Sequence, residues 1–325
     1  MPNYNHASEL DTSLSAIVDQ SRPFDEIIIV DDASTDHSLQ TIARFAARCP
    51  QLKLLRNSER LGVAASVNRG ISSATGSHVV LASADERVAD HMCSTFARVL
   101  DVFPELHIAV SRYSEWDERT GIVTEHDQSS PLGMWYATQE DPFEVSPEQF
   151  RSLLRQRFVW LGINTAIFRR GALLDVGGFD PNLQWHCDWF VSYAVAFRHG
   201  FCAVPRTLAW FRHSPDSYSA RGMRNSSAQE KVVVAIVEKL TKPEFADVGR
   251  AVRRSPAALS TFIRAMIPAL AKRPRYYGFL FDILRWWFGE VLRWRRPRML
   301  LELRERLLGR HATREIGRAS CRERV

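Results

Sequence analysis

Short apolar runs alternate with amphipathic stretches over the first third of the chain, and this alternation constrains the fold more than any other feature. The run EIIIVDD (26–32) is mostly Ile and Val, which is typical of a strand buried on both faces of a parallel sheet. Leu10, Leu14 and Ile17 recur at helical spacing within 7–20. The same reasoning predicts further strands at 52–55, 78–83 and 107–113, and further helices at 36–48, 60–75 and 89–104. Alternation at this spacing predicts a doubly wound α/β sheet.

Two pairs of acids follow the ends of two predicted strands. Asp31 and Asp32 end the run at 26–32, and Asp85 and Glu86 follow the apolar part of VVLASADERV (79–88). Ligands of doubly wound sheets bind beyond the carboxyl ends of the strands, so both pairs are expected to face one crevice. One interpretation is an ordinary polar turn at each strand end. The other is that the acids hold a cation against an anionic ligand.

The middle of the chain is irregular, and the last part is helical. Residues 114–150 contain several Gly and Pro, and we expect a loop-rich stretch that runs over the surface near the crevice. Order returns with GINTAIF (162–168), GGFD (177–180) and a helix from 188 to 199. Residues 228–310 have helical periodicity and almost no strand signal.

Charge is distributed unevenly along the chain. Residues 1–249 hold 24 Lys and Arg against 31 Asp and Glu, whereas residues 250–325 hold 19 against 6. Within this basic part, YYGFLFDILRWWF (276–288) has two charges in thirteen residues, which is short of the roughly 20 apolar residues that cross a bilayer. Its Trp, Tyr and Arg are typical of a helix lying in the interface of an anionic membrane. Nucleic acid is one alternative partner, and packing of these helices on the rest of the chain or on a second subunit is another.

Cysteine use and the N-terminal sequence predict a cytoplasmic protein. The five Cys include no CxxC pair, so they read as reduced thiols rather than a disulfide framework. The sequence MPNYNHASEL (1–10) has neither the basic flank nor the apolar run of a signal peptide. With the basic tail, this predicts a protein of the cytoplasm that contacts the inner face of the membrane peripherally.

The two ends of the sequence indicate where the natural protein differs from it. PNYNHASEL (2–10) reads as the loop and helix that follow a first strand, so we expect that strand upstream of Met1. EIGRASCRERV (315–325) resembles the translation of a common sequencing adapter, and we expect it to be foreign to the protein. We therefore expect a catalytic domain at 1–225 and a helical, basic extension at 226–314.

Six motifs in one order resemble those of family 2 glycosyltransferases, which have the GT-A fold. The motifs are PNYN (2–5), IIIVDDASTD (27–36), RNSERLGVAASVNRGISSATG (56–76), LASADE (81–86), GGFD (177–180) and HCDW (186–189). The resemblance covers roughly residues 2–213. It implies a Rossmann-like, doubly wound mixed sheet and a helical C-terminal extension. It also implies transfer of a sugar from a nucleotide diphospho-sugar to a hydroxyl of a glycan or lipid-linked acceptor, with inversion at C1. Such a reaction argues against nucleic acid as a partner.

The resemblance assigns the donor nucleotide to the first motifs. It implies that Asp31 and Asp32 accept hydrogen bonds from the base and ribose. Pro2, Tyr4 and Asn5 match the loop that lines the base pocket. The alternative for Asp31 and Asp32 is capping of the helix that follows.

Further along the chain, Arg60 precedes a helix that the resemblance places over the nucleotide. The side chain is a candidate phosphate contact. An exposed Arg at the start of a helix, with no ligand, is an equal alternative.

The acids after the strand 78–83 are the candidate metal ligands. The family commonly carries an additional acid two positions before Asp85, where this chain has Ser83. A hydroxyl is a weaker ligand than a carboxylate for a hard cation. The resemblance still implies that Asp85 and Glu86 hold Mg²⁺ or Mn²⁺ and that Asp85 also lies at the donor diphosphate. The alternative is a degenerate, merely polar strand end.

Asp188 is the candidate general base. The family carries an acidic pair at this point, whereas HCDW (186–189) keeps one acid only. One carboxylate suffices to take the proton of the attacking hydroxyl, and the start of a helix favours its ionised form. An N-cap without catalytic role is the alternative. We expect His186 and at least one of Trp185 and Trp189 to be structural, and we give Cys187 no role.

Two other classes of protein remain as alternatives. The missing acids at Ser83 and Cys187 suit a non-catalytic nucleotide-sugar-binding protein with a degenerate metal site. A nucleotidyltransferase would need a glycine-rich basic loop for a triphosphate, and PNYNHASEL (2–10) contains no Gly.

Overall fold

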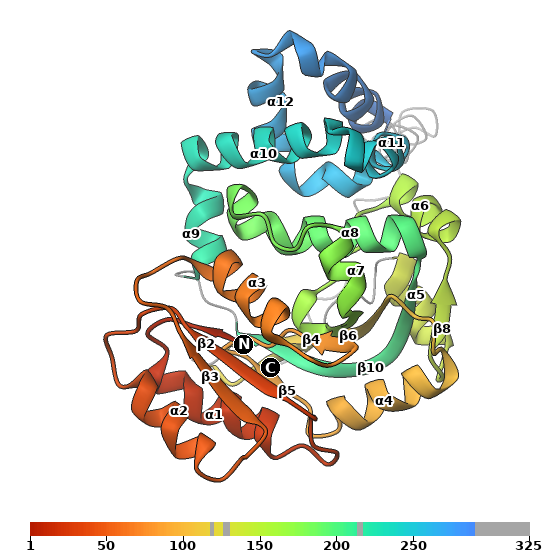
Figure 1. Ribbon diagram of the computed structural model, residues 1–325. Helices are drawn as coiled ribbons and strands as arrows, with labels where there is room; N and C mark the ends of the chain where they lie inside the picture. The colour runs from red at the N-terminus through yellow and green to blue at the C-terminus, as the bar shows by residue number, and fades with distance from the viewer. Residues whose placement is uncertain (118–119, 126–130, 213–216, 290–325) are drawn as a thin grey trace, which may run out of the picture.

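The structure is a computed structural model, and it describes residues 1–117, 120–125, 131–212 and 217–289 (Figure 1). The strands are β1 (Pro2–Asn3), β2 (Ile27–Asp31), β3 (Leu52–Arg56), β4 (His78–Val80), β5 (Arg87–Val88), β6 (Ile108–Trp116), β7 (Val123–Glu125), β8 (Phe143–Val145), β9 (Ala166–Arg169) and β10 (Phe201–Arg212). The α-helices are α1 (Ala7–Val18), α2 (Ser38–Ala46), α3 (Val63–Ser73), α4 (Met92–Val102), α5 (Pro131–Thr138), α6 (Pro147–Gln156), α7 (Arg170–Asp175), α8 (Cys187–His199), α9 (Tyr218–Arg224), α10 (Ser226–Thr241), α11 (Ala246–Arg254) and α12 (Ile263–Ala271). Short 3₁₀ helices are η1 (Ile163–Thr165), η2 (Pro181–His186), η3 (Pro243–Phe245), η4 (Pro256–Phe262) and η5 (Pro274–Tyr276), and residues 277–289 are helical.

The strands form two sheets. The smaller sheet is parallel, with the order β1-β2-β3. The larger has the order β4-β9-β6-β10-β5, and β7 and β8 pair with β6 and β10 at its margins. In this sheet β6 and β10 are parallel and the other pairings are antiparallel. The predicted α/β class and mixed strand directions are confirmed, with the strands divided between two sheets.

The predicted loop-rich stretch at 114–150 contains more helices and strands than expected. Strand β6 continues to Trp116, and β7, α5 and β8 follow within that range. Helix α6 also begins before residue 150, with Ser146 accepting a hydrogen bond from the backbone N–H of Gln149 as its N-cap. These strands pair at the margins of the larger sheet, so tertiary pairing rather than a strong local pattern defines them.

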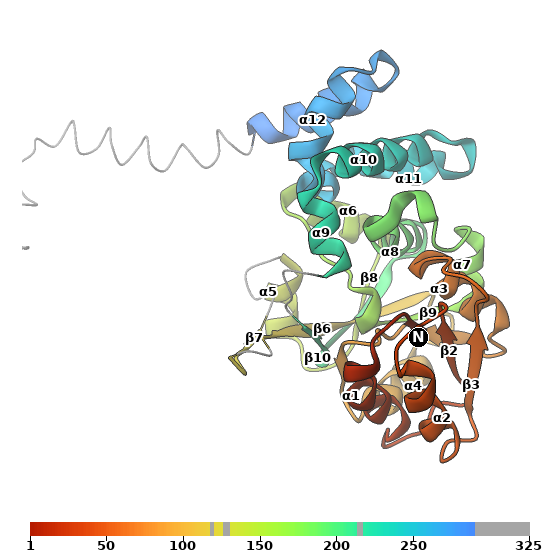
Figure 2. The ribbon, with the colours of Figure 1, turned by 90° about the vertical axis from the view of Figure 1, so that its left-hand side faces the viewer.

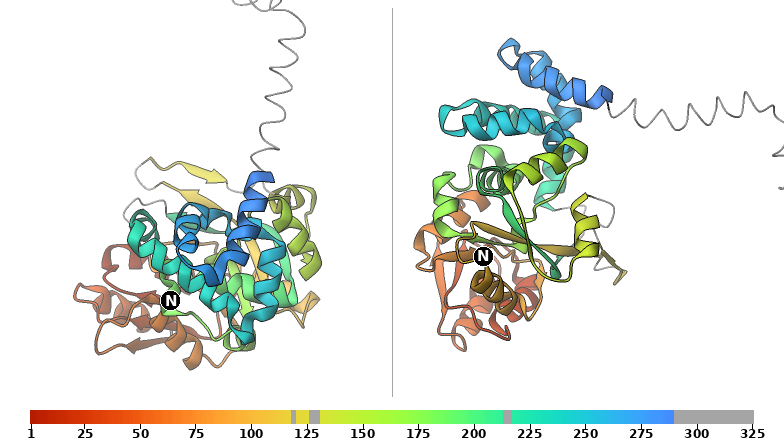
Figure 3. Two further views of the ribbon diagram at one scale, coloured as in Figure 1. Left: turned by 90° about the horizontal axis from the view of Figure 1, so that it is seen from above. Right: turned by 90° about the vertical axis from the view of Figure 1, so that its right-hand side faces the viewer.

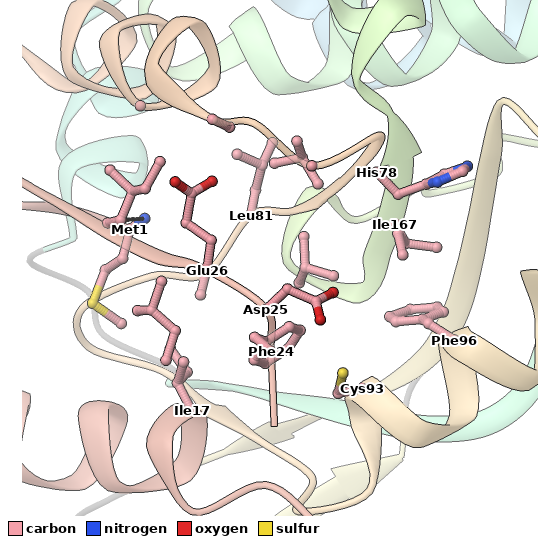
Figure 4. Close-up of a pocket in the computed structure, with 18 of the residues that line it drawn as sticks. Met1, Ile17, Phe24, Asp25, Glu26, His78, Leu81, Cys93, Phe96 and Ile167 are labelled. Atoms are coloured by element: carbon pink, nitrogen blue, oxygen red, sulfur yellow. Dashed lines mark hydrogen bonds between the residues drawn. The ribbon is translucent and has the colours of Figure 1, made fainter. Parts of the chain in front are cut away.

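The first strand is short, and a cavity lies beside it. β1 pairs with β2 through Pro2 and Asn3, opposite Val30 and Asp31. Between β2 and β4, a cavity of about 640 Å³ is lined mainly by apolar side chains (Figure 4). The labelled lining residues include Ile17, Phe24, Leu81, Phe96 and Ile167. The expected upstream strand stays a prediction.

Helices cover the larger sheet in successive layers. Helix α8 lies above it, α10 and α11 lie above α8, and α12 is at the far end from α1 and α2 (Figures 1 and 3). Ten of the thirteen residues of α8 are buried, as expected for a helix that is apolar on most sides. One buried cluster runs from Ala64 in α3 to Ile283, so the C-terminal helices share the core of the sheet. The predicted domain division at 225/226 stays a prediction.

The predicted helical character of the C-terminal part is confirmed as far as residue 289. The rest of the predicted extension, and the adapter-like residues 315–325, lie outside the described residues. Within the part of the chain that the structure describes, no helix is both long enough and apolar enough to cross a membrane.

Candidate active site

The end of β2 is tied to the first loop through Asp31. One oxygen of its buried carboxylate accepts a hydrogen bond from the Asn3 amide at 2.9 Å, and the other accepts one from the backbone N–H of Ser34 at 3.0 Å. The amide oxygen of Asn5 accepts a hydrogen bond from the backbone N–H of Thr35 at 2.8 Å. These bonds hold the predicted base-pocket loop against the acids after β2.

Asp32 organises the loop that leads into α3. Its carboxylate accepts hydrogen bonds from the side chain of Asn57 at 2.6 Å and from the backbone N–H groups of Leu61 and Gly62, both at 2.8 Å. Burial acts to raise the pKa of Asp32, but these bonds and one from Ser66 outweigh it and lower the pKa. A carboxylate has about four acceptor positions, and these four bonds occupy them, so Asp32 fixes the loop in place.

Arg60 lies on the aromatic ring of Tyr4. The guanidinium carbon is 4.0 Å from the ring centre, at a distance typical of a cation–π contact, and Arg60 is exposed. Tyr218, at the start of α9, lies within electrostatic range of both Arg60 and Cys187. Helix α9 therefore stands between the predicted nucleoside residues and the start of α8.

The predicted metal ligands lie in the turn between β4 and β5. The hydroxyl of Ser83 donates a hydrogen bond to Asp85 at 2.8 Å, so it acts as a partner of that acid. The amide of Asn164, in η1, donates to the carboxylate of Glu86. Asp85 and Glu86 are half-buried.

Glu86 lies close to two other acids, Asp85 and Asp188. Burial raises the pKa of Glu86 well above its usual value, the charges of Asp85 and Asp188 raise it further, and the bond from Asn164 acts against them. We call Asp85, Glu86 and Asp188 the acid cluster. Glu86 and Asp188 are 102 positions apart in sequence, yet the fold brings them within electrostatic range of each other.

Asp188 is in the first turn of α8. Its carboxylate accepts a hydrogen bond from the backbone N–H of Trp189 at 2.7 Å. Burial raises the pKa of Asp188 to about 6, and bonds from backbone N–H groups only partly oppose this. The N–H groups at the helix start therefore favour the ionised carboxylate, as predicted, but burial has the larger effect on its pKa.

The neighbours of Asp188 are buried. His186 is buried, and its ring lies 2.9 Å from the side-chain nitrogen of Gln229 and packs on Phe262. Burial lowers the pKa of His186 to about 4, so its ring is neutral. Trp189 is buried in the core, and burial raises the pKa of the Cys187 thiol.

Three aromatic rings pack on one another near the part of β10 that pairs with β5, and the sequence did not single them out. Tyr113 and Trp160 have ring centres 4.2 Å apart, and Phe211 is 4.9 Å from Trp160. All three are half-buried. Strand β5 pairs Arg87 with Trp210, and Glu86 and Phe211 are the next residues of the two chains at this end of the pairing. We call Tyr113, Trp160 and Phe211 the aromatic wall.

The ring of Trp160 lies over a glycine. A Cβ atom added at Gly162 would lie 2.3 Å from the Trp160 ring, so only Gly fits there. Asn164 follows two residues later and reaches Glu86. A polar Asn within the apolar run GINTAIF (162–168) was the sequence signal for this contact.

The predicted site residues thus form two adjacent groups. The first surrounds the ends of β1 and β2 and contains Pro2, Tyr4, Asn5, Asp31, Asp32 and Arg60. The second is the acid cluster. Across the described parts of the chain, no three His, Cys, Asp or Glu side chains lie close enough to hold a metal ion by themselves. Two carboxylates suit Mg²⁺ or Mn²⁺ when substrate phosphates and water supply the other ligands.

Comparison with known sequences points to one family. Residues 1–161 match the model of glycosyl transferase family 2. An uncharacterized protein of Mycobacterium tuberculosis is 26% identical over 277 residues, covering 82% of this chain and 83% of that protein. An uncharacterized glycosyltransferase of Nostoc sp. is 26% identical over 235 residues, covering 70% of this chain and 68% of that protein.

Solved structures share the fold. S. aureus TarS in complex with UDP-GlcNAc superposes with a TM-score of 0.56 at 16% identity, over 87% of each chain. The mannosyltransferase PcManGT from Pyrobaculum calidifontis, in complex with GDP-Man and Mn²⁺, gives 0.51 at 21% identity, over 92% of this chain and 81% of that one. The chain has the GT-A fold, and its residues 1–161 belong to glycosyl transferase family 2.

Proposed function

We propose that this glycosyltransferase moves a hexose from a nucleotide diphospho-sugar to a hydroxyl of a glycan or lipid-linked acceptor, with inversion at C1. The observation that carries the proposal is the meeting of Asp188 with Asp85 and Glu86 in one half-buried site. An inverting transfer needs a base on the acceptor side and neutralisation of charge on the leaving diphosphate. The acid cluster offers candidates for both tasks.

Asp188 is the proposed base. Its pKa of about 6 lies near neutral pH, where a general base is most effective, and it is mostly ionised at pH 7. The acceptor oxygen forms a bond to C1 while its proton passes to Asp188. The bond from C1 to the diphosphate oxygen breaks, and its electron pair leaves with the nucleoside diphosphate.

Asp85 and Glu86 are the proposed ligands of a divalent cation. The charges of Asp85 and Asp188 raise the pKa of Glu86, and a bound cation would relieve that repulsion. Mg²⁺ or Mn²⁺ held there would neutralise charge on the diphosphate, as ions of this kind do in phosphate sites. Ser83 supports Asp85 by its hydrogen bond and is not needed as a ligand.

The donor nucleoside is proposed to bind at the ends of β1 and β2. Asp31 and the loop of Pro2, Tyr4 and Asn5 offer acceptors and an aromatic ring in one place, and Asp32 holds the neighbouring loop at Leu61 and Gly62 beside them. Arg60 can leave the Tyr4 ring for a phosphate, because the contact is exposed and worth only about 0.5–1 kcal/mol.

The aromatic wall supports a sugar as the acceptor. Partly exposed aromatic rings next to catalytic acids present an apolar face and a few polar groups, the usual lining of a small-molecule site. The Trp160 ring packs against Gly162, Tyr113 and Phe211, and these contacts limit the side-chain freedom that it would lose on binding a ligand.

A donor panel tests the proposal. The chain would be incubated with UDP-, GDP- and dTDP-sugars, with Mn²⁺, with Mg²⁺ or with EDTA, and with a lipid extract as acceptor, while release of nucleoside diphosphate is measured. We expect one donor to support release that needs both the extract and the cation. Binding of a donor nucleotide without release, under every condition, would instead favour the non-catalytic binding protein.

A further inference from the structure

Exposed apolar side chains are concentrated on the last described helix, residues 277–289. Tyr277, Phe281, Trp287 and Phe288 are 49%, 65%, 38% and 55% exposed. Other exposed large apolar residues in the described part of the chain are scattered over several elements, such as Val102 on α4 and Leu174 on α7. Soluble proteins usually expose large apolar residues singly, so a group of them on one helix indicates a binding surface.

The exposed side chains form one stripe because of their spacing. Tyr277, Phe281 and Phe288 are separated by four and seven residues, which places them on one face of an α-helix, and half-buried Leu284 lies between them. The opposite face carries Phe279 and Ile283, which are buried in the shared core. The helix is therefore anchored to the protein by one face and presents the other outward. We call Tyr277, Phe281, Leu284 and Phe288 the outer stripe.

The surroundings of the outer stripe are basic. Arg285 is exposed beside it, and Arg275, just before it, is exposed but ion-paired with Glu238. The chain that continues from this helix, residues 290–314, holds eight Arg against three Glu. The helix lies at the end of the molecule remote from α1 and α2, where it meets no other described element on its outer side (Figure 2).

We propose that the outer stripe is the surface by which this protein lies on an anionic lipid bilayer. Aromatic and aliphatic side chains at the headgroup boundary, with Arg beside them, are the chemistry of an interfacial helix. A second copy of the chain is a weaker candidate, because two such faces would bring like charges together. The inference concerns where the enzyme works and does not depend on the proposed transfer reaction.

Sedimentation with lipid vesicles tests this inference directly. The full chain would be mixed with vesicles of phosphatidylcholine alone or of phosphatidylcholine with phosphatidylglycerol, at low and high salt. We expect it to sediment with the anionic vesicles at low salt. The double variant Phe281→Ser/Phe288→Ser should lower the partition coefficient at least about tenfold, because it removes the largest apolar groups of the stripe.

A matched double variant, Val102→Ser/Leu174→Ser, removes exposed apolar groups of α4 and α7 and should bind vesicles like the parent. Circular dichroism would establish that both variants are folded. Unchanged vesicle binding by Phe281→Ser/Phe288→Ser would overturn the proposal, since the bilayer would then be contacted elsewhere. A dimer in light scattering that only this variant dissociates, with no vesicle binding by the parent, would overturn it in favour of a second copy.

Discussion

Asn68 in α3 bonds to both backbone groups of Phe179, in the loop before η2. Its amide nitrogen donates to the Phe179 carbonyl at 2.8 Å, and its amide oxygen accepts from the Phe179 N–H at 2.8 Å. Lys239 of α10 holds the same loop through Asp180 at 3.0 Å, in a largely buried ion pair. The segment that leads to Asp188 is thus fixed from the nucleotide side and from the C-terminal helices.

We expect Gly178→Ala to break this attachment. Gly178 has φ of +64°, and a Cβ atom there would lie 2.5 Å from the Asn68 side-chain oxygen. Strain and a lost pair of hydrogen bonds should lower the free energy of unfolding by about 2–3 kcal/mol. Chemical denaturation measures this. Gly171→Ala in α7 is the control, because its Cβ would meet nothing within 4 Å and it should be neutral or slightly stabilising. Equal stability of the two variants would contradict this account.

The sequence predicted the buried strand β2 closely but not the short elements after residue 114. The continuous Ile and Val of β2 are a strong local signal, and the observed strand, Ile27–Asp31, differs little from the predicted 26–32. The three-residue strands β7 and β8 depend on pairing with β6 and β10. Hydrophobic periodicity within three residues does not reveal such a pairing. Local patterns therefore predict the central strands better than the margins.

The candidate site was predictable in its residues but not in its contacts. Motifs identified Asp85, Glu86 and Asp188, whereas the link from Asn164 to Glu86 depends on how η1 packs. The sequence did not predict the raised pKa of Asp188, because burial depends on tertiary packing. The effect of burial on this pKa is larger than that of the N–H groups at the helix start, which the sequence does reveal.

The raised pKa of Asp188 should reduce stability at neutral pH. An acid whose pKa is raised in the folded state from 3.8 to about 6 loses stability as pH rises between these values. We expect Asp188→Asn to be more stable than the parent by about 1–3 kcal/mol above pH 6, with a small difference near pH 4. Denaturation of both proteins across this pH range measures it, and a difference independent of pH would refute the assignment.

Asp85→Ala should weaken cation dependence. Losing one of two carboxylate ligands should lower turnover at fixed Mn²⁺ by about 10²-fold or more, and added Mn²⁺ should restore part of it. Asp141→Ala removes an exposed acid outside the site and should leave the Mn²⁺ titration unchanged. If Asp85→Ala and the parent have the same Mn²⁺ requirement, Asp85 is no ligand.

Trp160→Ala should affect the acceptor more than the donor. Removing this ring of the aromatic wall should raise the acceptor KM by about tenfold, while the donor KM stays within about twofold. Trp116→Ala is the matched control, because that ring lies under Arg87, on the other face of the sheet. Initial rates with each substrate varied in turn separate the two constants, and a larger effect on the donor KM would contradict the assignment.

Turnover and nucleotide binding by Asp188→Asn test the central claim most directly. Asparagine keeps the shape of the side chain but cannot take a proton, so we expect the rate of sugar transfer to fall by about 10²–10⁴-fold. Donor nucleotide affinity, measured by calorimetry, should stay close to that of the parent, since Asp188 lies outside the proposed nucleoside group. In the parent, kcat/KM should rise with pH through about 6, and this step should disappear in the variant. Transfer by Asp188→Asn at the parental rate would show that another group is the base and would contradict the mechanism proposed for this site.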